Sequence, residues 1–447
     1  MVAILLTSVL SYAMISAYSR RRYDIFLLLL ITMMSRYFYL LPIEITKSCE
    51  HIQNLALTAL FLHNLIKGRI SIGGTIGRII LLLLAYFHIR MIFSVLLGEE
   101  TFIQAFKVVL TNYYMLAYFL FLKIDEDSLN RICKPLFVMT IVGGIAYYLQ
   151  FVGINLLQGR VDSSISMNSF RYMNVPQLLQ PCLIYLLFCK NKIKYRHLYL
   201  LFLIPMILLP QSRGTIMAFS SACVLYVLYL KNPKAVIKLL VVAFVGFFAF
   251  EPLLQARFSD GKGNQSIFEA IGSGFDIRRS DDFDASQSDT YAFRIAMAME
   301  RVEYLSDDPI KLLFGVGTMH EETGQKQFNF HLGSRVKNKE GRVTKGQIET
   351  SDIEFMTYTF RYGIVYLIIM LAFLIQVYRI FHRHLQNNKW AIVGYVFFVR
   401  CAIQCTGTNP FSEWKLENCF ILFLLAAILF SKERDTAQSC MVKKNEF

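Results

Sequence analysis

The sequence predicts an all-α fold, a polytopic integral membrane protein of about thirteen transmembrane helices with one large loop between the tenth and the eleventh. The chain has 447 residues and only 17% of them are charged, whereas a soluble protein carries about 25% charged residues. Apolar runs near the ~20 residues that span a bilayer recur along the chain. The segment 252–354 is mostly polar, and so belongs in water, because hydrocarbon cannot satisfy exposed backbone groups.

Short basic clusters orient the predicted helices. Three of them are Arg20–Arg22, KNKIKYRH at 190–197 and RIFHRHLQNNK at 379–389. The positive-inside rule places such clusters in the cytoplasm. With the predicted number and order of helices, every strongly basic loop falls on that side of the membrane. Because this clustering explains the net charge of +14, and no nucleic-acid-binding module is visible, we expect contact with the lipid bilayer and no nucleic-acid partner.

The first ten predicted helices occupy residues 1–251. The apolar run 1–18 lacks a basic leader and a clear cleavage site, so we expect a retained helix and not a secretory signal. The eighth helix contains Pro205 and Pro210, which predict a kink or a break. Further helices are expected at about 24–42, 52–66, 135–152 and 175–189.

The rest of the chain divides into three parts. The loop 252–354 is expected to be partly helical, because DTYAFRIAMAMERVEYL within it has an amphipathic pattern. Helices eleven to thirteen occupy 355–431, and a basic cytoplasmic tail fills 432–447.

Nine cysteines lie mostly in apolar runs, where cysteine behaves as a small hydrophobic residue. Cys401 and Cys405 share a helix face, but no histidine or further cysteine lies near them. We therefore expect no metal site and no disulfide framework. We also expect no cofactor.

Four arginines on the outer side are candidates for binding an anion. Arg213 follows the proline-interrupted helix and breaks the positive-inside pattern, Arg294 lies in the amphipathic loop segment, and Arg160 and Arg171 lie in the second-largest outer loop. Guanidinium groups bind phosphate through paired hydrogen bonds, so these positions predict a phosphate ligand. In the alternative interpretation Arg213 snorkels or has a structural partner, and the other three are solvated surface residues.

Three residues are candidates for accepting a proton. His331 lies in the large loop, and Asp352 and Glu354 lie where that loop re-enters the membrane. A carboxylate in a partly dry site can act as a general base. Alternatively, the two carboxylates favour the start of the eleventh helix electrostatically, and the histidine has no special role.

Several short motifs follow one another in a recognisable order. They are Arg171 with Asn174-Val-Pro176, Ser212-Arg213-Gly214, Arg294, LLFGVGT at 312–318, Ser351-Asp352-Ile353-Glu354-Phe355 and Arg361-Tyr362-Gly363-Ile364-Val365. In this order, with the large loop two helices after the Ser-Arg-Gly motif, the chain resembles the bacterial O-antigen polymerase and O-antigen ligase superfamily of polytopic glycosyltransferases.

This resemblance implies a substrate, a location and a chemistry. The substrate is an undecaprenyl-diphosphate-linked oligosaccharide at the periplasmic face of the bacterial inner membrane. Arg213 and Arg294, with Arg171 and Arg160, would bind the diphosphate without a metal. Asp352, Glu354 or His331 would take the acceptor's proton in an inverting transfer. A polysaccharide chain-length regulator is implied as a partner.

Three functions remain open from the sequence. The ligases of this superfamily have a histidine near the end of the loop, where this chain has Ser351-Asp352-Ile353-Glu354, so the resemblance favours a polymerase over a ligase-like transferase. A polysaccharide flippase or another transporter, which is not an enzyme, is the third. Helix interiors here are nearly free of charge except at Arg36, His88, Arg90 and Arg400, and this favours catalysis on an external substrate.

Overall fold

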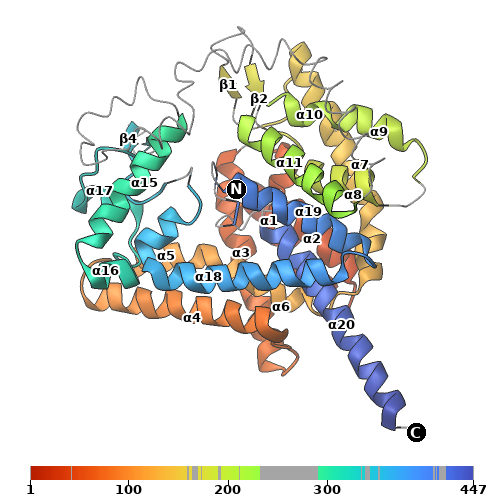
Figure 1. The fold of residues 1–447 in the computed structure, drawn as a ribbon, viewed down its shortest axis with the longest axis horizontal. Helices are drawn as coiled ribbons and strands as arrows, with labels where there is room; N and C mark the ends of the chain where they lie inside the picture. The colour runs from red at the N-terminus through yellow and green to blue at the C-terminus, as the bar shows by residue number, and fades with distance from the viewer. Residues whose placement is uncertain are drawn as a thin grey trace.

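The computed structural model describes most of the chain as helices joined by short turns and two small hairpins (Figure 1). The described residues are 2–41, 43–158, 161–163, 170–172, 174–189, 193–210, 212–231, 290–333, 335–337, 343–350, 353–405, 408, 410–411 and 419–445.

The first third of the chain is a succession of apolar helices. Its elements are α1 (Val2–Ser19), α2 (Tyr23–Met34), η1 (Arg36–Tyr39), α3 (Ile43–Ile66), α4 (Gly74–Leu96), α5 (Phe102–Leu110), η2 (Thr111–Leu116), α6 (Ala117–Phe121), α7 (Glu126–Leu149) and η3 (Gln150–Val152). α5, η2 and α6 follow one another without a gap and form one helical run from Phe102 to Phe121, in which η2 is a 3₁₀ segment.

Two boundaries in this part differ from the sequence prediction for local reasons. The sequence predicts a sixth helix from Pro135, but α7 begins at Glu126, because the Asp125 carboxylate accepts the Ser128 backbone N–H at 3.0 Å and caps the helix. The sequence predicts a second helix that reaches residue 42, but α2 ends at Met34, and Arg36–Tyr39 adopt positive φ angles.

The middle of the chain contains a hairpin followed by short helices. Its elements are β1 (Val161–Ser163), β2 (Phe170–Tyr172), α8 (Leu179–Phe188), α9 (Arg196–Leu203), α10 (Pro205–Leu208) and α11 (Arg213–Tyr229). The two strands are antiparallel, with Val161 opposite Tyr172. The predicted break in the eighth helix is confirmed, since α9 ends just before Pro205. The tenth predicted helix, which ends near Glu251, lies outside the described residues.

The last part contains helices of the large loop and then three long helices. Its elements are α15 (Thr290–Ser306), α16 (Pro309–Phe314), α17 (Glu321–Gln327), β3 (Arg335–Lys337), β4 (Val343–Lys345), α18 (Met356–His384), α19 (Lys389–Gln404) and α20 (Ile421–Asn445). The loop is partly helical, as its amphipathic pattern predicts. Most of the expected tail, 432–447, continues the helix α20.

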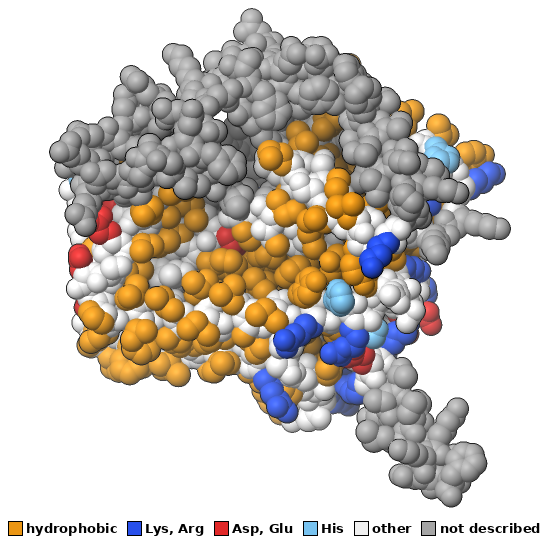
Figure 2. Space-filling view, viewed as in Figure 1, with side chains coloured by type: hydrophobic (Ala, Val, Ile, Leu, Met, Phe, Trp, Pro, Cys, Tyr) orange, Lys and Arg blue, Asp and Glu red, His pale blue; other side chains and the backbone are white. Residues whose placement is uncertain are grey.

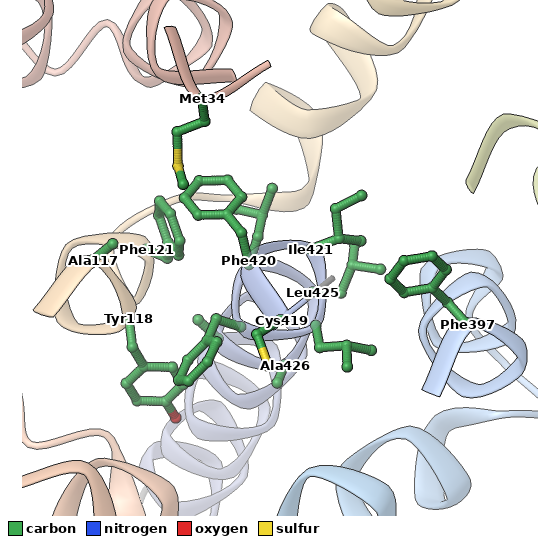
Figure 3. Close-up of a cluster of buried hydrophobic side chains, with 14 of the residues drawn as sticks. Met34, Ala117, Tyr118, Phe121, Phe397, Cys419, Phe420, Ile421, Leu425 and Ala426 are labelled. Atoms are coloured by element: carbon green, nitrogen blue, oxygen red, sulfur yellow. The ribbon is translucent and has the colours of Figure 1, made fainter. Parts of the chain in front are cut away.

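The start of α20 lies at the centre of the hydrophobic core. Figure 3 shows Phe420 and Ile421 between Phe121 of α6 and Phe397 of α19. The Phe121 and Phe420 rings meet edge to face at 5.3 Å. Along one edge of the molecule, α4 and α18 lie side by side, and α15 to α17 gather at the end where α18 begins (Figure 1).

Much of the surface of these helices is apolar. By length and composition, three helices among the described residues are able to cross a membrane, namely Gly74–Leu96, Glu126–Val152 and Met356–His384. Large hydrophobic side chains such as Leu82, Val142 and Ile368 are exposed on them, and Figure 2 shows an extensive hydrophobic face. The structure therefore has the helical character of a membrane protein, and the expected number of about thirteen spans stays a prediction.

Basic residues from separate helices meet at one end of the molecule. Side-chain contacts there join Arg383 to Glu433, Lys432 to Glu126, Arg131 to Asp24 and Arg434 to Ser71. Figure 2 shows this gathering of Lys and Arg side chains near the end of α18. Arg383, from the predicted cytoplasmic cluster 379–389, thus lies near basic residues of α7 and α20.

Candidate functional site

The site is built where α11 begins and α19 ends. These two helices pack against each other and run antiparallel, since Gln404 Nε2 donates to Thr215 Oγ1 at 3.3 Å while the Tyr395 ring lies 6.1 Å from the ring of Tyr229. Arg213 is the first residue of α11, so its backbone lies beside the last turn of α19. Only the backbone of Arg213 is among the described parts of that residue.

Glu354 joins the end of the large loop to the end of α19. Its carboxylate accepts the Phe411 N–H at 2.8 Å and the Cys405 thiol at 3.9 Å through Oε2, and its own neighbour Phe355 N–H at 3.2 Å through Oε1. The side chain is 7% exposed. Glu354 is therefore buried, and the Phe411 N–H, in the segment that follows α19, fixes the orientation of its carboxylate. Asp352 lies outside the described residues.

A hydrophobic contact brings Arg294 to the same region. Ile353, next to Glu354, packs against a cluster of Ala296, Met297 and Leu332. Arg294 precedes Met297 by three residues on α15, and positions three apart share a helix face. The face of α15 that carries Arg294 thus packs toward the segment that carries Glu354.

The glycine turn of the large loop docks on a break in α18. At Gly363 the backbone leaves the helical region (φ 71°, ψ −170°), so the carbonyls before it lack their usual helical donors. Val316 N–H donates to the Phe360 carbonyl at 2.9 Å, and Gly317 N–H to the Arg361 carbonyl at 3.0 Å. Two motifs used in the resemblance, LLFGVGT and the segment around Gly363, therefore contact each other directly.

Buried charges hold the loop together away from the site. Arg301 is fully buried and donates to the carbonyls of Met297, Leu332 and Gly346 at 2.8–3.2 Å. Burial lowers its pKa to about 10, and the nearby carboxylates of Glu300 and Glu321 oppose this shift. The guanidinium remains charged at neutral pH and serves as a structural cross-link.

His331 lies on the surface of this loop assembly. Its backbone N–H donates to Glu300 Oε1 at 2.6 Å, and its carbonyl accepts from Lys345 Nζ at 2.9 Å. The residue is exposed, whereas the next residue, Leu332, is buried against Ile353. His331 is thus exposed, while Glu354 is buried, and the two residues are chain neighbours of Leu332 and Ile353, which pack together.

The other two candidate arginines belong to the hairpin of β1 and β2. Arg171 pairs with Asp162 across the two strands, its side chain is not among the described parts, and Arg160 lies outside the described residues. The hairpin is anchored to the end of α7 and to η3. Asn174 and Gln150 exchange amide hydrogen bonds of 2.8 and 3.2 Å, and Tyr147 Oη donates to the Tyr172 carbonyl at 3.1 Å.

Sequence reasoning missed the residues that α19 contributes. Arg400 and Gln404 are 5% and 8% exposed and lie one turn apart on α19, and Gln404 contacts Thr215 at the start of α11. Cys401, next to Arg400, lies within electrostatic reach of both Arg400 and Glu354. The signal was present in the sequence, since Arg400 is a lone charge within an apolar helix.

Four segments far apart in the chain thus meet in one region: the starts of α11 and α18, the first turns of α15 and the end of α19. Groups of three or more metal-ligating side chains are not found among the described residues. No protein-family model matches the chain, and no curated protein matches its sequence.

Proposed function

We propose that this protein is a polysaccharide polymerase of the O-antigen polymerase type. It transfers a glycan from undecaprenyl diphosphate onto another lipid-linked repeat unit at the periplasmic face of the bacterial inner membrane. The observation that carries the proposal is the meeting of the starts of α11 and α18, the face of α15 and the end of α19. These segments carry Arg213, Arg294 and Glu354, and the motifs that resemble the superfamily lie on them.

The arrangement suits the transfer of a sugar from a diphosphate. The lipid diphosphate is a good leaving group, so an enzyme must stabilise the charge that develops on it and remove a proton from the acceptor hydroxyl. Arg213 and Arg294 supply positive charge for the diphosphate. Glu354, buried and oriented by the Phe411 N–H, takes the acceptor proton. Attack on the anomeric carbon from the side opposite the leaving diphosphate inverts that centre.

The orientation in the membrane supports the same proposal. The basic loops meet at the end of the molecule where α18 ends, and Glu354 lies at the end where α18 begins. With the basic end in the cytoplasm, a chain of about thirteen spans would leave the loop 252–354 in the periplasm. A polysaccharide chain-length regulator is the partner that a polymerase of this kind would use.

Reconstitution tests the proposal. Purified protein in proteoliposomes, supplied with lipid-linked repeat units from the source strain, should form a ladder of polymer lengths. Arg213→Ala and Arg294→Ala should each lower the initial rate about a hundredfold. Each variant removes a positive charge that stabilises the departing diphosphate. Arg131→Ala, at the basic end and with its side chain 55% exposed, is the matched control and should keep the wild-type rate.

Other products would lead to other conclusions. A single transfer to a lipid A core would identify a ligase-like transferase. Movement of the donor across the bilayer without any glycan product would identify a transporter, and the polymerase proposal would then be abandoned. Full activity in both well-expressed arginine variants would remove the proposed diphosphate site.

A further inference from the structure

Arg400 is a buried charge to which the described part of the chain offers no oxygen partner. Its one hydrogen bond there runs from Nη1 to Cys401 Sγ at 3.5 Å, its Cζ lies 5.5 Å from the centre of the Phe397 ring, and its Nε has no hydrogen-bond partner. None of the ion pairs within the described part of the chain includes it. A buried charge left in this way is strongly unfavourable.

The other buried arginines of the described residues are satisfied differently. Arg301 donates to three carbonyls and to the Glu300 carboxylate. Arg361 donates to the Met319 carbonyl at 3.0 Å and to Glu349 at 3.4 Å. Both have the partners that a structural arginine requires. Arg400 lacks such partners among the described residues, and a lone charge buried in an otherwise largely apolar helix indicates a functional role.

Gln404 offers a second unsatisfied group one turn further along α19. Its Nε2 donates to Thr215 Oγ1, and its buried Oε1 has no hydrogen-bond partner among the described residues. Four residues of helix separate the two side chains by about 6 Å along the axis. α19 begins at the basic end, where Trp390 Nε1 donates to Asn130. Arg400 therefore lies nearer the basic end, and Gln404 lies one turn further toward the opposite end of the molecule.

The start of α11 adds positive potential to this position. α11 has 17 residues, and Thr215 in its first turn contacts Gln404. The first N–H groups of a helix and its dipole attract an anion. The helix start of α11 therefore favours an anion beside Gln404, and the cation of Arg400 favours one a turn further along the pair of helices, toward the basic end.

We propose that Arg400 and Gln404 bind the glycosyl phosphate head of a membrane lipid, with the phosphate on Arg400 and a sugar hydroxyl on Gln404. The order fits a lipid-linked sugar, whose sugar lies outward and whose phosphate lies nearer the hydrocarbon. This inference rests on the proposed function, because the lipid-linked donor is the ligand that reaches this depth.

Binding to the full-length protein in lipid nanodiscs tests the site, with the dissociation constant measured for each of several probes. The probes are undecaprenyl diphosphate, the same lipid carrying one N-acetylhexosamine, undecaprenol and inorganic pyrophosphate. Arg400→Gln should weaken binding of both lipid diphosphates about 10- to 100-fold, the usual range for a hydrogen bond to a charged group, and leave undecaprenol unchanged. Gln404→Leu should weaken only the sugar-bearing lipid.

Thermal unfolding without ligand separates binding from structure. Arg400→Gln should keep or raise the Tm, because it removes an unfavourable buried charge. Arg301→Gln, the matched control, should lower the Tm, because it leaves buried carbonyls without donors. Arg400→Lys keeps the charge but loses the planar fork, and its affinity should lie between those of the wild type and Arg400→Gln.

Three outcomes would overturn the inference. The first is a Tm loss in Arg400→Gln like that of Arg301→Gln, or failure of this variant to fold, since either shows a structural role. The second is unchanged lipid diphosphate binding in Arg400→Gln while the wild type forms its polymer ladder, in which case the proposed function stands and only this site fails. The third is binding of pyrophosphate but not of the lipid, which shows a site for a soluble anion.

Discussion

Buried carboxylates in the large loop are held by backbone amides. Glu321 is 6% exposed, and its two oxygens accept the N–H groups of Gln347, Ile348 and Glu349 at 2.6–3.0 Å. Hydrogen bonds to a charged acceptor are stronger than those between neutral groups. This carboxylate fixes the strand-to-helix connection that leads toward Glu354, although no distinguishing motif surrounds it in the sequence.

Replacing this carboxylate by an amide should loosen the connection. In Glu321→Gln one acceptor oxygen is replaced by an NH₂ group that faces backbone donors, which should cost about 2 kcal/mol. Hydrogen exchange should then speed up at the amides of Gln347–Glu349. Glu303→Gln, exposed on α15, is the control and should leave exchange at these amides unchanged. Equal exchange in both variants would show that the carboxylate is dispensable.

At the scale of elements, the break in α18 determines where the loop docks. Gly363 has a backbone conformation that only glycine adopts readily, and a Cβ there would collide with the Leu313 carbonyl. Gly315 makes the reciprocal approach, since its Cβ would collide with the Arg361 carbonyl. The two glycines thus allow two backbones to pack without intervening side chains.

A methyl group at this contact should separate the loop from α18. Gly363→Ala combines a strained φ with a clash against backbone, so we expect destabilisation of about 3 kcal/mol or more. The measurement is the Tm together with limited proteolysis between α15 and α17. Gly98→Ala is the control, because Gly98 also has a positive φ (70°) but a Cβ added to it would have no described atom within 4 Å. Similar losses in both variants would mean that backbone strain alone, and not docking, matters at Gly363.

At the scale of the whole molecule, charge and apolar surface together predict an orientation in a membrane. The basic loops meet at one end, the exposed hydrophobic side chains cover the long helices, and α15 to α17 lie where α18 begins (Figures 1 and 2). The positive-inside rule predicts that the basic end lies in the cytoplasm. The proposed chemistry then takes place outside.

Labelling of introduced cysteines should show this orientation. In right-side-out membrane vesicles, a thiol reagent that cannot cross the bilayer should label Asn329→Cys and should not label Lys67→Cys. Both positions are exposed, and Lys67 belongs to a basic loop. After the vesicles are permeabilised, both variants should react above the wild-type background. The reverse pattern would invert the topology and exclude a periplasmic site.

The helical membrane class, the proline break before α10, the helix in the large loop and the basic loops that meet at one end all follow from the sequence alone. These features depend on local composition and periodicity, which can be seen in one segment of the sequence without knowledge of the segments it packs against. The sequence also singles out Arg213, Arg294 and Glu354 as separate candidates. It does not predict that Phe411 orients Glu354, nor that Gly315 and Gly363 let two backbones touch.

Which of these residues share a site becomes visible only in the folded chain. Arg400 and Arg301 look alike as arginines in partly apolar helices, and both lie over an aromatic ring, but packing gives Arg301 three carbonyls and gives Arg400 a thiol. The groups that can form hydrogen bonds with a buried charge lie on segments distant in the chain. Their positions are set by how helices pack, and the sequence of one helix does not contain that information.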